Sequence, residues 1–469
     1  MELKVSMSDT SPTIRWETTA FTIDLVQNDA GAICVRSILP ARVSAQRPAS
    51  PLFDLSELPL VSVKLAGEGN TFDKTAKSLV GSCLSARLKY ESHEIQNDDQ
   101  VETLEIRSRD EITKTLVTTR LSVYGAIPVL RSLATITDES ENTDNNVTQL
   151  SSITVGGLTT KSQQWYHDYR LLTTTNSWFR EAQWREQTLP EIGINNDGIC
   201  ELPYGHLCSQ ATFGLQSHGS FSTSSHLPMG ALRSNDNEDT WLWQVEHNGS
   251  WRWEIGDNKD SIYLVAGGPT GMDHDWKQVL HPGQSFTTIP VALTRVTGYQ
   301  RQIIRPHEDN ENLPIMFNDY MNCLMGDPDE DKVAALLDPV AKTGAKYFVI
   351  DARWYADDST WWDDVGLWEP SQKRFPSGSK VLLDKIRSKG LIPGLWLELE
   401  VVGVRSVVGS RLPKDAFFQE CGQGIIEKGR FQLDYRHPEV RTWMDTVIHN
   451  LVINYGVGYF KFDYNIEVT

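Results

Sequence analysis

The sequence has 469 residues, of which 39% are hydrophobic, and its formal net charge is −18 at pH 7. This length exceeds one ordinary domain and predicts two or three. The negative charge argues against a nucleic-acid-binding protein, which needs clustered Lys and Arg side chains. No run approaches the roughly 18 apolar residues that span a bilayer, so we expect no membrane partner.

The amino-terminal stretch and the cysteines bear on the compartment. The opening MELKVSMSDTSPTIRWE lacks the apolar core of a secretory signal, which predicts a cytoplasmic protein. The six cysteines are scattered without a CxxC pair, so they indicate neither a zinc site nor a disulfide framework. Many of the 15 tryptophans stand beside carboxylates. Core packing and a surface that stacks on sugars explain this equally well at this point.

Residues 1–300 carry the pattern of β-strands. Short segments alternate apolar and polar residues and are separated by Asn, Asp, Gly and Ser turns, as at 20–27, 101–109, 115–125, 240–247 and 261–268. Many short strands with regular turns predict a large antiparallel sandwich. The acidic, Asn-rich stretch 297–314 is predicted to be a connector.

After the connector, the pattern changes to strands that alternate with helices. We predict strands at 315–321, 345–355, 391–402 and 457–465, and helices at 327–344, 377–390 and 437–456. Gly344, Gly390 and Gly456 end the three helices, and Pro438 takes the favoured first helical position of the last one. This alternation predicts a parallel β/α sheet.

The number of β/α units leaves two architectures open. A closed (β/α)₈ barrel needs eight units and about 250 residues, whereas an open doubly wound sheet can be built from the four units seen here. Polar residues at the carboxyl ends of the predicted strands favour the barrel, whose active site lies at that end. These residues are Asp351, Glu398, Glu400, Lys461, Asp463 and Asn465.

The segment YFKFDYN at 459–465 is the strongest candidate site. The strand period of two is expected to point Lys461, Asp463 and Asn465 to one side. A carboxylate beside an ammonium group stays ionised, which suits a carboxylate nucleophile. A structural ion pair at a strand end is the alternative interpretation.

Further carboxylates follow the other strands. Asp351 can bind sugar hydroxyls or cap the next segment, and Trp396, Glu398 and Glu400 alternate at the end of the third strand. Converging carboxylates repel one another unless something binds them. Mg²⁺ or Ca²⁺ is one candidate, although Lys461 and the nearby Arg430 bring positive charge to the same rim.

Several of these segments resemble a known family. The segments 317–322, 349–358, 394–403, 429–441 and 459–465 resemble, in order and spacing, successive blocks of glycoside hydrolase family 36, the α-galactosidase (melibiase) family. Looser similarity to its amino-terminal domain extends over 176–193, 222–232 and 243–257. The resemblance implies a β-supersandwich over 1–300 and then a (β/α)₈ TIM-type barrel, of which 301–469 would form the first half, about four β/α units.

The resemblance also implies an activity. Members are retaining exo-α-galactosidases that release terminal α-D-galactosyl residues from oligosaccharides of the melibiose and raffinose type, through a covalent galactosyl–Asp intermediate. They need no metal or organic cofactor, and they commonly form oligomers through the amino-terminal domain. The resemblance implies that Asp463 is the nucleophile and that Lys461, Arg430 and Asp351 contact the sugar. Trp396 would form a subsite wall, and Asn465 would complete the nucleophile motif. Tyr320 stands at a substrate-binding position where many members have Trp.

The sequence departs from the family pattern in two places. Ala352 follows Asp351 where the family has a second aspartate, for which Asp357 and Asp358 are candidate replacements. A retaining glycosidase also needs an acid/base carboxyl about 5–5.5 Å from the nucleophile. In this family that residue lies in a later barrel strand, so we expect a chain truncated within the barrel and inactive by itself. A non-catalytic carbohydrate-binding protein, an α-N-acetylgalactosaminidase and a galactosyl-transferring relative are the alternative functions.

Overall fold

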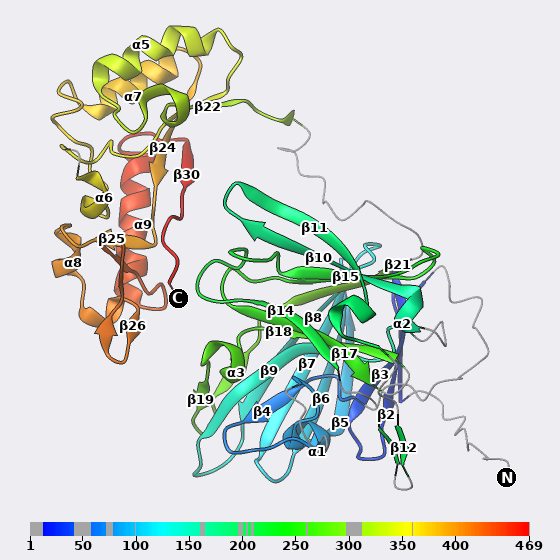
Figure 1. Ribbon diagram of the computed structural model, residues 1–469. Coiled ribbons are helices and arrows are strands. Elements are labelled where there is room, and N and C mark those ends of the chain that lie inside the picture. Colours follow the sequence, from blue (N-terminus) through cyan, green and yellow to red (C-terminus); the bar gives the residue numbers. More distant parts are fainter. Residues whose placement is uncertain are drawn as a thin grey trace. The chain divides into compact units, whose positions relative to one another are not determined.

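The computed structural model describes residues 13–41, 58–71, 78–98, 100–159, 165–195, 200–202, 205–207, 211–258, 261–296, 312–358 and 360–468 (Figure 1). The chain divides into two compact units, Met1–Arg301 and Gln302–Thr469, and each is considered by itself. Most of the predicted connector, residues 297–311, and the opening residues 1–12 lie outside the described residues.

The first unit is built from antiparallel sheets. A ten-stranded sheet has the order β11-β10-β15-β16-β21-β8-β7-β6-β5, with β20 paired to β8. Its strands are β5 (Lys89–Asn97), β6 (Val101–Asp110), β7 (Thr115–Tyr124), β8 (Leu130–Asp138), β10 (Tyr169–Ser177), β11 (Arg180–Thr188), β15 (Met229–Ser234), β16 (Thr240–Val245), β20 (Ser285–Thr287) and β21 (Val291–Val296).

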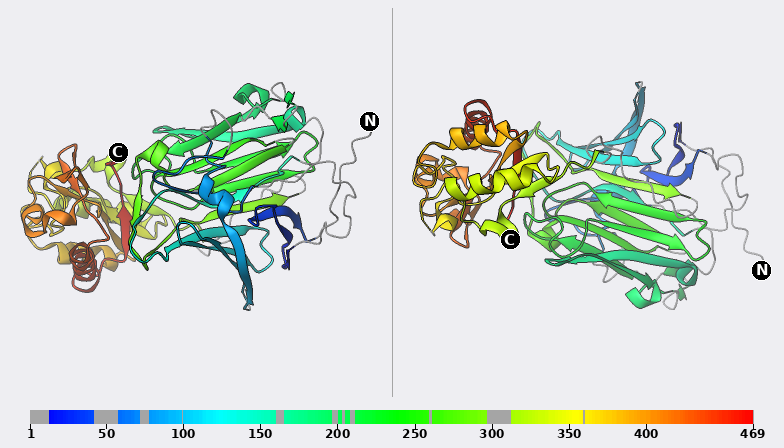
Figure 2. Two further views of the ribbon diagram at one scale, coloured as in Figure 1. Left: turned by 90° about the horizontal axis from the view of Figure 1, so that it is seen from below. Right: turned by 90° about the horizontal axis from the view of Figure 1, so that it is seen from above.

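A second, six-stranded sheet has the order β14-β17-β18-β9-β19, with β4 paired to β9. Figure 1 labels its strands, and Figure 2 shows the strands of this unit from two further sides. Its strands are β4 (Val63–Leu65), β9 (Asn145–Val155), β14 (Thr212–Ser217), β17 (Trp251–Asn258), β18 (Ser261–Gly267) and β19 (Gln278–Leu280). A three-stranded sheet β1-β2-β3 and a hairpin β12-β13 accompany it. These strands are β1 (Ile14–Glu17), β2 (Phe21–Gln27), β3 (Ile33–Pro40), β12 (Cys200–Leu202) and β13 (Gly205–Leu207).

The predicted antiparallel sandwich is confirmed, and its core follows from the period-two pattern of the strands. Along β8, residues alternate between buried and half-buried from Leu130 to Asp138. The buried residues of both large sheets join one hydrophobic cluster, which includes Leu104 of β6 and Ile153 of β9. Nine described tryptophans are buried in the two units, so core packing accounts for most of the Trp content. Three short helices, α1 (Cys83–Arg87), α2 (Trp165–Asp168) and α3 (Gly271–His274), connect strands without having been predicted.

The second unit is a parallel sheet with the order β22-β23-β24-β30. The strands follow one another in the order of the sequence, as in a (β/α)₈ barrel, whereas a doubly wound sheet reverses its strand order. This feature decides between the two architectures that the sequence left open, in favour of a partial barrel. The strands are β22 (Met316–Asn318), β23 (Tyr347–Ile350), β24 (Ile392–Leu397) and β30 (Tyr459–Phe462).

The three predicted helices are present, each a little shorter than predicted. They are α5 (Glu330–Ala341), α7 (Ser379–Ser388) and α9 (Pro438–Ile453), and α5 and α7 lie side by side in Figure 1. Asp329 caps α5 by accepting from the Lys332 N–H, and Pro438 opens α9 as predicted. Among the described residues, no helix combines the length and apolar character needed to cross a membrane.

The remaining elements of this unit lie in the loops. They are α6 (Trp361–Asp364), α8 (Val408–Arg411), the small sheet β25 (Val401–Gly403), β29 (Arg430–Gln432) and β28 (Ile426–Glu427), and the hairpin β26 (Gln419–Glu420) and β27 (Gln423–Gly424).

The predicted strand ends were wrong. β24 stops at Leu397 and β30 at Phe462, so Glu398, Glu400, Asp463 and Asn465 follow the strands. After β24 the chain leaves the parallel sheet because β25 pairs with β29 in the separate antiparallel sheet. Period-two alternation by itself does not detect this change of partner.

Close packing in the sandwich predicts the effect of a single added methyl group. A Cβ built on Gly230 would lie 2.6 Å from the ring of Trp243, which is completely buried. We therefore expect Gly230→Ala to lower the free energy of unfolding by about 1–3 kcal/mol. Thermal and urea unfolding measure the change. Gly69→Ala is the matched control, since no atom lies within 4 Å of its added Cβ; equal stability of the two variants would contradict the packing argument.

Candidate active site

Charged side chains from different strand ends meet at the carboxyl edge of the parallel sheet. Lys461 Nζ of β30 lies 2.8 Å from Asp351 Oδ2, just past β23, and 3.8 Å from Asp463 Oδ2, just past β30. Asp351 is buried, whereas the side chains of Lys461 and Asp463 are each 36% exposed. One ammonium group therefore contacts two carboxylates that are distant in the sequence.

Asp463 is held on both carboxylate oxygens. Its Oδ2 accepts from the Trp396 indole Nε1–H at 2.9 Å, and its Oδ1 accepts from the Tyr464 N–H at 3.2 Å. Its own N–H donates to Leu397 O at 2.9 Å, which continues the pairing of β24 and β30 for one residue past the strand. The donors and the Lys461 charge stabilise a fixed, negatively charged carboxylate.

Trp396, which donates to this carboxylate, lies in a cluster of aromatic rings. Its ring is 1% exposed and lies among Tyr355, Trp361 and Trp368, with centroids 5.9 to 6.3 Å away. Trp354 Nε1–H donates to Trp396 O at 2.8 Å, which ties the cluster to β24. The family resemblance implies a subsite wall at Trp396, and that role stays a prediction. In the structure, Trp396 is buried and its indole N–H donates to the Asp463 carboxylate.

Glu398 and Arg430 form an ion pair with no exposed surface on either side chain. Arg430 Nη1 donates to Glu398 Oε2, Arg430 Nε donates to Trp362 O at 2.9 Å, and the guanidinium lies 3.5 Å from the Trp362 ring centroid. Glu398 Oε1 accepts from the Asn465 N–H at 3.1 Å. The pair thereby fixes the backbone two residues after Asp463.

This burial changes the expectation for Arg430 and Asn465. A completely buried guanidinium offers no surface to a sugar. The position of Arg430 in the structure therefore does not support the sugar contact that the resemblance implies. Asn465 is exposed and is held through its backbone N–H. Burial raises the pKa of Glu398 and lowers that of Arg430, while each partner favours the charged form of the other.

Two further carboxyl groups have strongly raised pKa values. Burial, followed by the neighbouring negative charges of Glu398 and Asp463, raises the pKa of Glu400 to about 7. Burial and the charge of Asp351 also raise the pKa of Asp319 to about 7, against the hydrogen bond from the Asp351 N–H and the charge of Lys461. The sequence predicted Glu400 at this rim but did not single out Asp319. The signal that could have identified Asp319 is its place in the sequence, as an acidic residue directly after the first short strand of a β/α unit.

The remaining candidates are held by their own loops. Tyr320 begins an irregular turn, Tyr320–Leu324, and its N–H donates to Asn318 Oδ1 at 3.0 Å. Asp357 Oδ1 accepts from Ser371 Oγ at 2.5 Å, and Asp358 Oδ1 accepts from the Thr360 N–H at 2.8 Å. These contacts join neither aspartate to Asp351, so they do not support either one as its second carboxylate.

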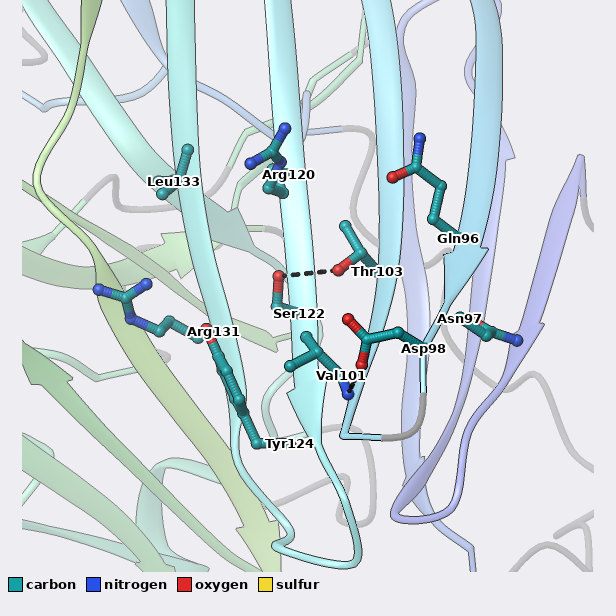
Figure 3. Close-up of a pocket in the computed structure, with 10 residues that line it drawn as sticks. All are labelled: Gln96, Asn97, Asp98, Val101, Thr103, Arg120, Ser122, Tyr124, Arg131 and Leu133. Carbon is teal, nitrogen blue, oxygen red and sulfur yellow. Dashed lines mark hydrogen bonds between the residues drawn. The ribbon is translucent and has the colours of Figure 1, made fainter.

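A cavity of about 650 Å³ lies elsewhere, on the first unit (Figure 3). It is lined from β5 to β8, and its arginines are already paired: Arg120 with Glu105 at 3.2 Å and Arg131 with Glu246 at 2.7 Å. The charged arginines of its lining therefore already have ion-pair partners, and the cavity is distinct from the carboxylate cluster. Within the described part of the chain, no group of three or more His, Cys, Asp or Glu side chains is arranged to hold a metal ion.

The buried ion pair predicts non-additive effects of substitution. Arg430→Met leaves the Glu398 carboxylate buried without its partner, which we expect to lower the free energy of unfolding by about 3–5 kcal/mol. The double variant with Glu398→Met removes both charges and should be more stable than Arg430→Met alone. Urea unfolding of the two single variants and the double variant tests this. Additive losses would show that the two groups are not coupled.

Comparison with known proteins found a family model that matches the part of the chain that carries this site. The model of the Melibiase family matches residues 291–469, which contain the whole parallel sheet. α-Galactosidase 1 of Pediococcus pentosaceus is 23% identical over 278 residues, 55% of this chain and 37% of the relative. α-Galactosidase AgaA of Geobacillus stearothermophilus is 20% identical over 388 residues, 80% of this chain and 50% of the relative. The chain thus spans between about a third and a half of these relatives.

Solved structures agree in fold. The crystal structure of a variant of the family 36 α-galactosidase AgaA of Geobacillus stearothermophilus, in complex with raffinose, matches with a TM-score of 0.75 and 18% identity, over 97% of this chain and 66% of that one. The α-galactosidase of Lactobacillus brevis matches with a TM-score of 0.75 and 17% identity, over 97% and 64%. The resemblance drawn from the sequence is confirmed: residues 291–469 match the model of the Melibiase family, and the chain has the fold of family 36 glycoside hydrolases.

Proposed function

We propose that this chain supplies the nucleophile, Asp463, for the retaining hydrolysis of terminal α-D-galactosyl residues of oligosaccharides. The observation that carries the proposal is the half-exposed Asp463 carboxylate, fixed by Trp396 and Lys461 at the carboxyl edge of a melibiase-family sheet. In (β/α)₈ enzymes, catalytic residues come from this edge. The AgaA complex with raffinose supports an oligosaccharide of that type as the substrate.

In the proposed first step, an Asp463 oxygen attacks the anomeric carbon of galactose. The bond from that carbon to the leaving oxygen breaks, and the leaving oxygen takes up a proton. Water then attacks the galactosyl–Asp463 ester, which releases galactose and restores the carboxylate. Trp396 keeps the carboxylate in one orientation, so little freedom is lost when the sugar arrives.

Asp351 and Lys461 are proposed to bind galactose hydroxyls. A carboxylate accepts and an ammonium group donates hydrogen bonds, and Lys461 contacts both Asp351 and Asp463. The buried Arg430 is assigned a supporting position behind Glu398 instead of a sugar contact. Tyr320 and Asn465 remain proposed neighbours of the substrate.

The proposal assigns no residue of this sequence to the acid/base. Glu400 holds a proton near neutral pH and interacts electrostatically with Asp463, but no contact places it on a leaving group. A p-nitrophenyl leaving group needs little protonation, so its departure tests the nucleophile separately from the acid. A homo-oligomer formed through the first unit and a cytoplasmic location are also proposals.

Trapping of the intermediate tests the nucleophile directly. We expect a fluorinated α-galactosyl fluoride to attach one sugar to the protein, since fluorine slows hydrolysis of the ester more than its formation when the leaving group is good. Intact-mass spectrometry and peptide mapping should locate the sugar on Asp463. Asp463→Asn should abolish labelling and lower release of p-nitrophenol from its α-galactoside by about a thousandfold or more.

Asp445→Asn is the matched control, because Asp445 is exposed on α9, and it should label as the unchanged protein does. Labelling at another carboxylate would overturn the assignment of Asp463. Binding of galactose without labelling or turnover would favour a carbohydrate-binding protein. Faster turnover of the p-nitrophenyl α-N-acetylgalactosaminide would favour a different sugar specificity.

A further inference from the structure

The end of β22 is joined to the end of β23 in an unusual way. In a regular parallel ladder, the Asp319 N–H would donate to the Val349 carbonyl and the Asp319 carbonyl would accept from the Asp351 N–H. The first of these bonds is present, from Asp319 N to Val349 O at 3.2 Å. The second is replaced: the Asp319 side chain Oδ1 accepts from the Asp351 N–H at 2.8 Å.

This replacement frees the Asp319 carbonyl for another purpose. Asp319 O accepts from the Leu324 N–H at 2.7 Å, which closes the irregular turn that begins at Tyr320. The chain can therefore turn away after β22 while the ladder to Asp351 stays complete. An apolar side chain at 319 would leave the buried Asp351 N–H without its partner, at the cost of a lost hydrogen bond.

Asp351 forms hydrogen bonds with two neighbouring residues of the same short segment, Asn318 and Asp319. Asp319 holds its backbone, and the neighbouring Asn318 Nδ2–H donates to its Oδ2 at 2.6 Å, the same oxygen that accepts from Lys461 Nζ. The remaining oxygen, Oδ1, accepts from the Ala352 N–H at 2.8 Å. The position of the Asp351 carboxylate thus depends on residues 318 and 319.

Asp319 is itself suited to remain uncharged. It is 1% exposed, and its Oδ2 has no hydrogen-bond partner among the described residues. The charged groups that act on it are Asp351, from the end of β23, and Lys461, from β30. A second carboxylate charge beside Asp351 would compete with Asp351 for the single ammonium group of Lys461.

We propose that Asp319 is a positioning residue: its side chain takes the place of a backbone carbonyl and, in the protonated form, holds Asp351 in register for binding a galactose hydroxyl. The inference rests on the proposed function of Asp351. Ionisation of Asp319 would weaken the Asp351–Lys461 pair, so sugar binding should become weaker as the pH rises through about 7, which is the pKa of Asp319.

Two variants of the full chain separate positioning from a general structural role. Asp319→Asn keeps an acceptor oxygen for the Asp351 N–H but cannot ionise, and Asp319→Leu removes the acceptor. By titration with galactose at pH 6, we expect Asp319→Asn to bind within about threefold of the unchanged protein and Asp319→Leu about tenfold more weakly. Between pH 6 and 8, the affinity of the unchanged protein should fall and that of Asp319→Asn should stay constant.

A second measurement does not depend on sugar binding. The unfolded chain ionises Asp319 near pH 4, whereas the folded chain keeps it protonated up to about pH 7, so the unchanged protein loses stability as the pH rises over this window. The melting temperature of Asp319→Asn minus that of the unchanged protein should therefore grow from pH 4 to pH 7 and be level above it. Asp331→Asn, exposed on α5, is the control and should show a constant difference.

The outcomes distinguish the two proposals. If neither the variants nor the unchanged protein bind galactose, the proposed function fails, while the melting temperatures still test the protonated Asp319. Equal affinity of Asp319→Leu and the unchanged protein would overturn the positioning role. A pH-dependent loss of affinity that persists in Asp319→Asn, or a melting-temperature difference that is flat from pH 4 to 7, would overturn the protonated form. If Asp319→Leu does not fold, Asp319→Asn and its two pH profiles decide the matter.

Discussion

The arrangement of the second unit depends on one constraint: four parallel strands, in the order of the sequence, end at the same edge of a sheet. Because all four run in one direction, the residues that follow them are brought together whatever lies between them in the chain. Lys461 can then contact both Asp351 and Asp463. Without the parallel order, these groups would lie at opposite ends of the sheet.

Around this edge, the polar groups are fixed by layers of buried contacts. Aromatic rings pack beneath Asp463 and leave the Trp396 N–H as its donor. The Glu398–Arg430 pair, flanked by Trp362, holds the backbone at Asn465. Buried charge of this kind is costly unless every partner is present, and in return it restricts the site to few conformations. A fixed carboxylate is what a nucleophilic mechanism requires.

Raised pKa values mark the same edge independently. Asp319 and Glu400 both titrate near pH 7 because burial and neighbouring carboxylates disfavour their charged forms. Perturbed carboxyl groups gather at functional sites more often than elsewhere. By contrast, the cavity on the first unit is lined by Arg120 and Arg131 (Figure 3), and these arginines are paired with Glu105 and Glu246. The perturbed carboxyl groups therefore favour the strand ends over this cavity as the candidate site.

The sequence by itself determined the class of each unit and marked residues 459–465 as the strongest candidate site. Period-two patterns and turn residues are local, so strands such as β7 and helices such as α9 could be predicted closely from neighbouring residues. The tertiary structure decided where strands stop and which side chains are buried. The family resemblance implied a sugar contact for Arg430, which is buried, and Asp319 was not singled out. Burial and hydrogen-bond partners depend on segments that are distant in the chain. The pairing of β25 with β29 removed Glu400 from the strand, and no local pattern records that choice of partner.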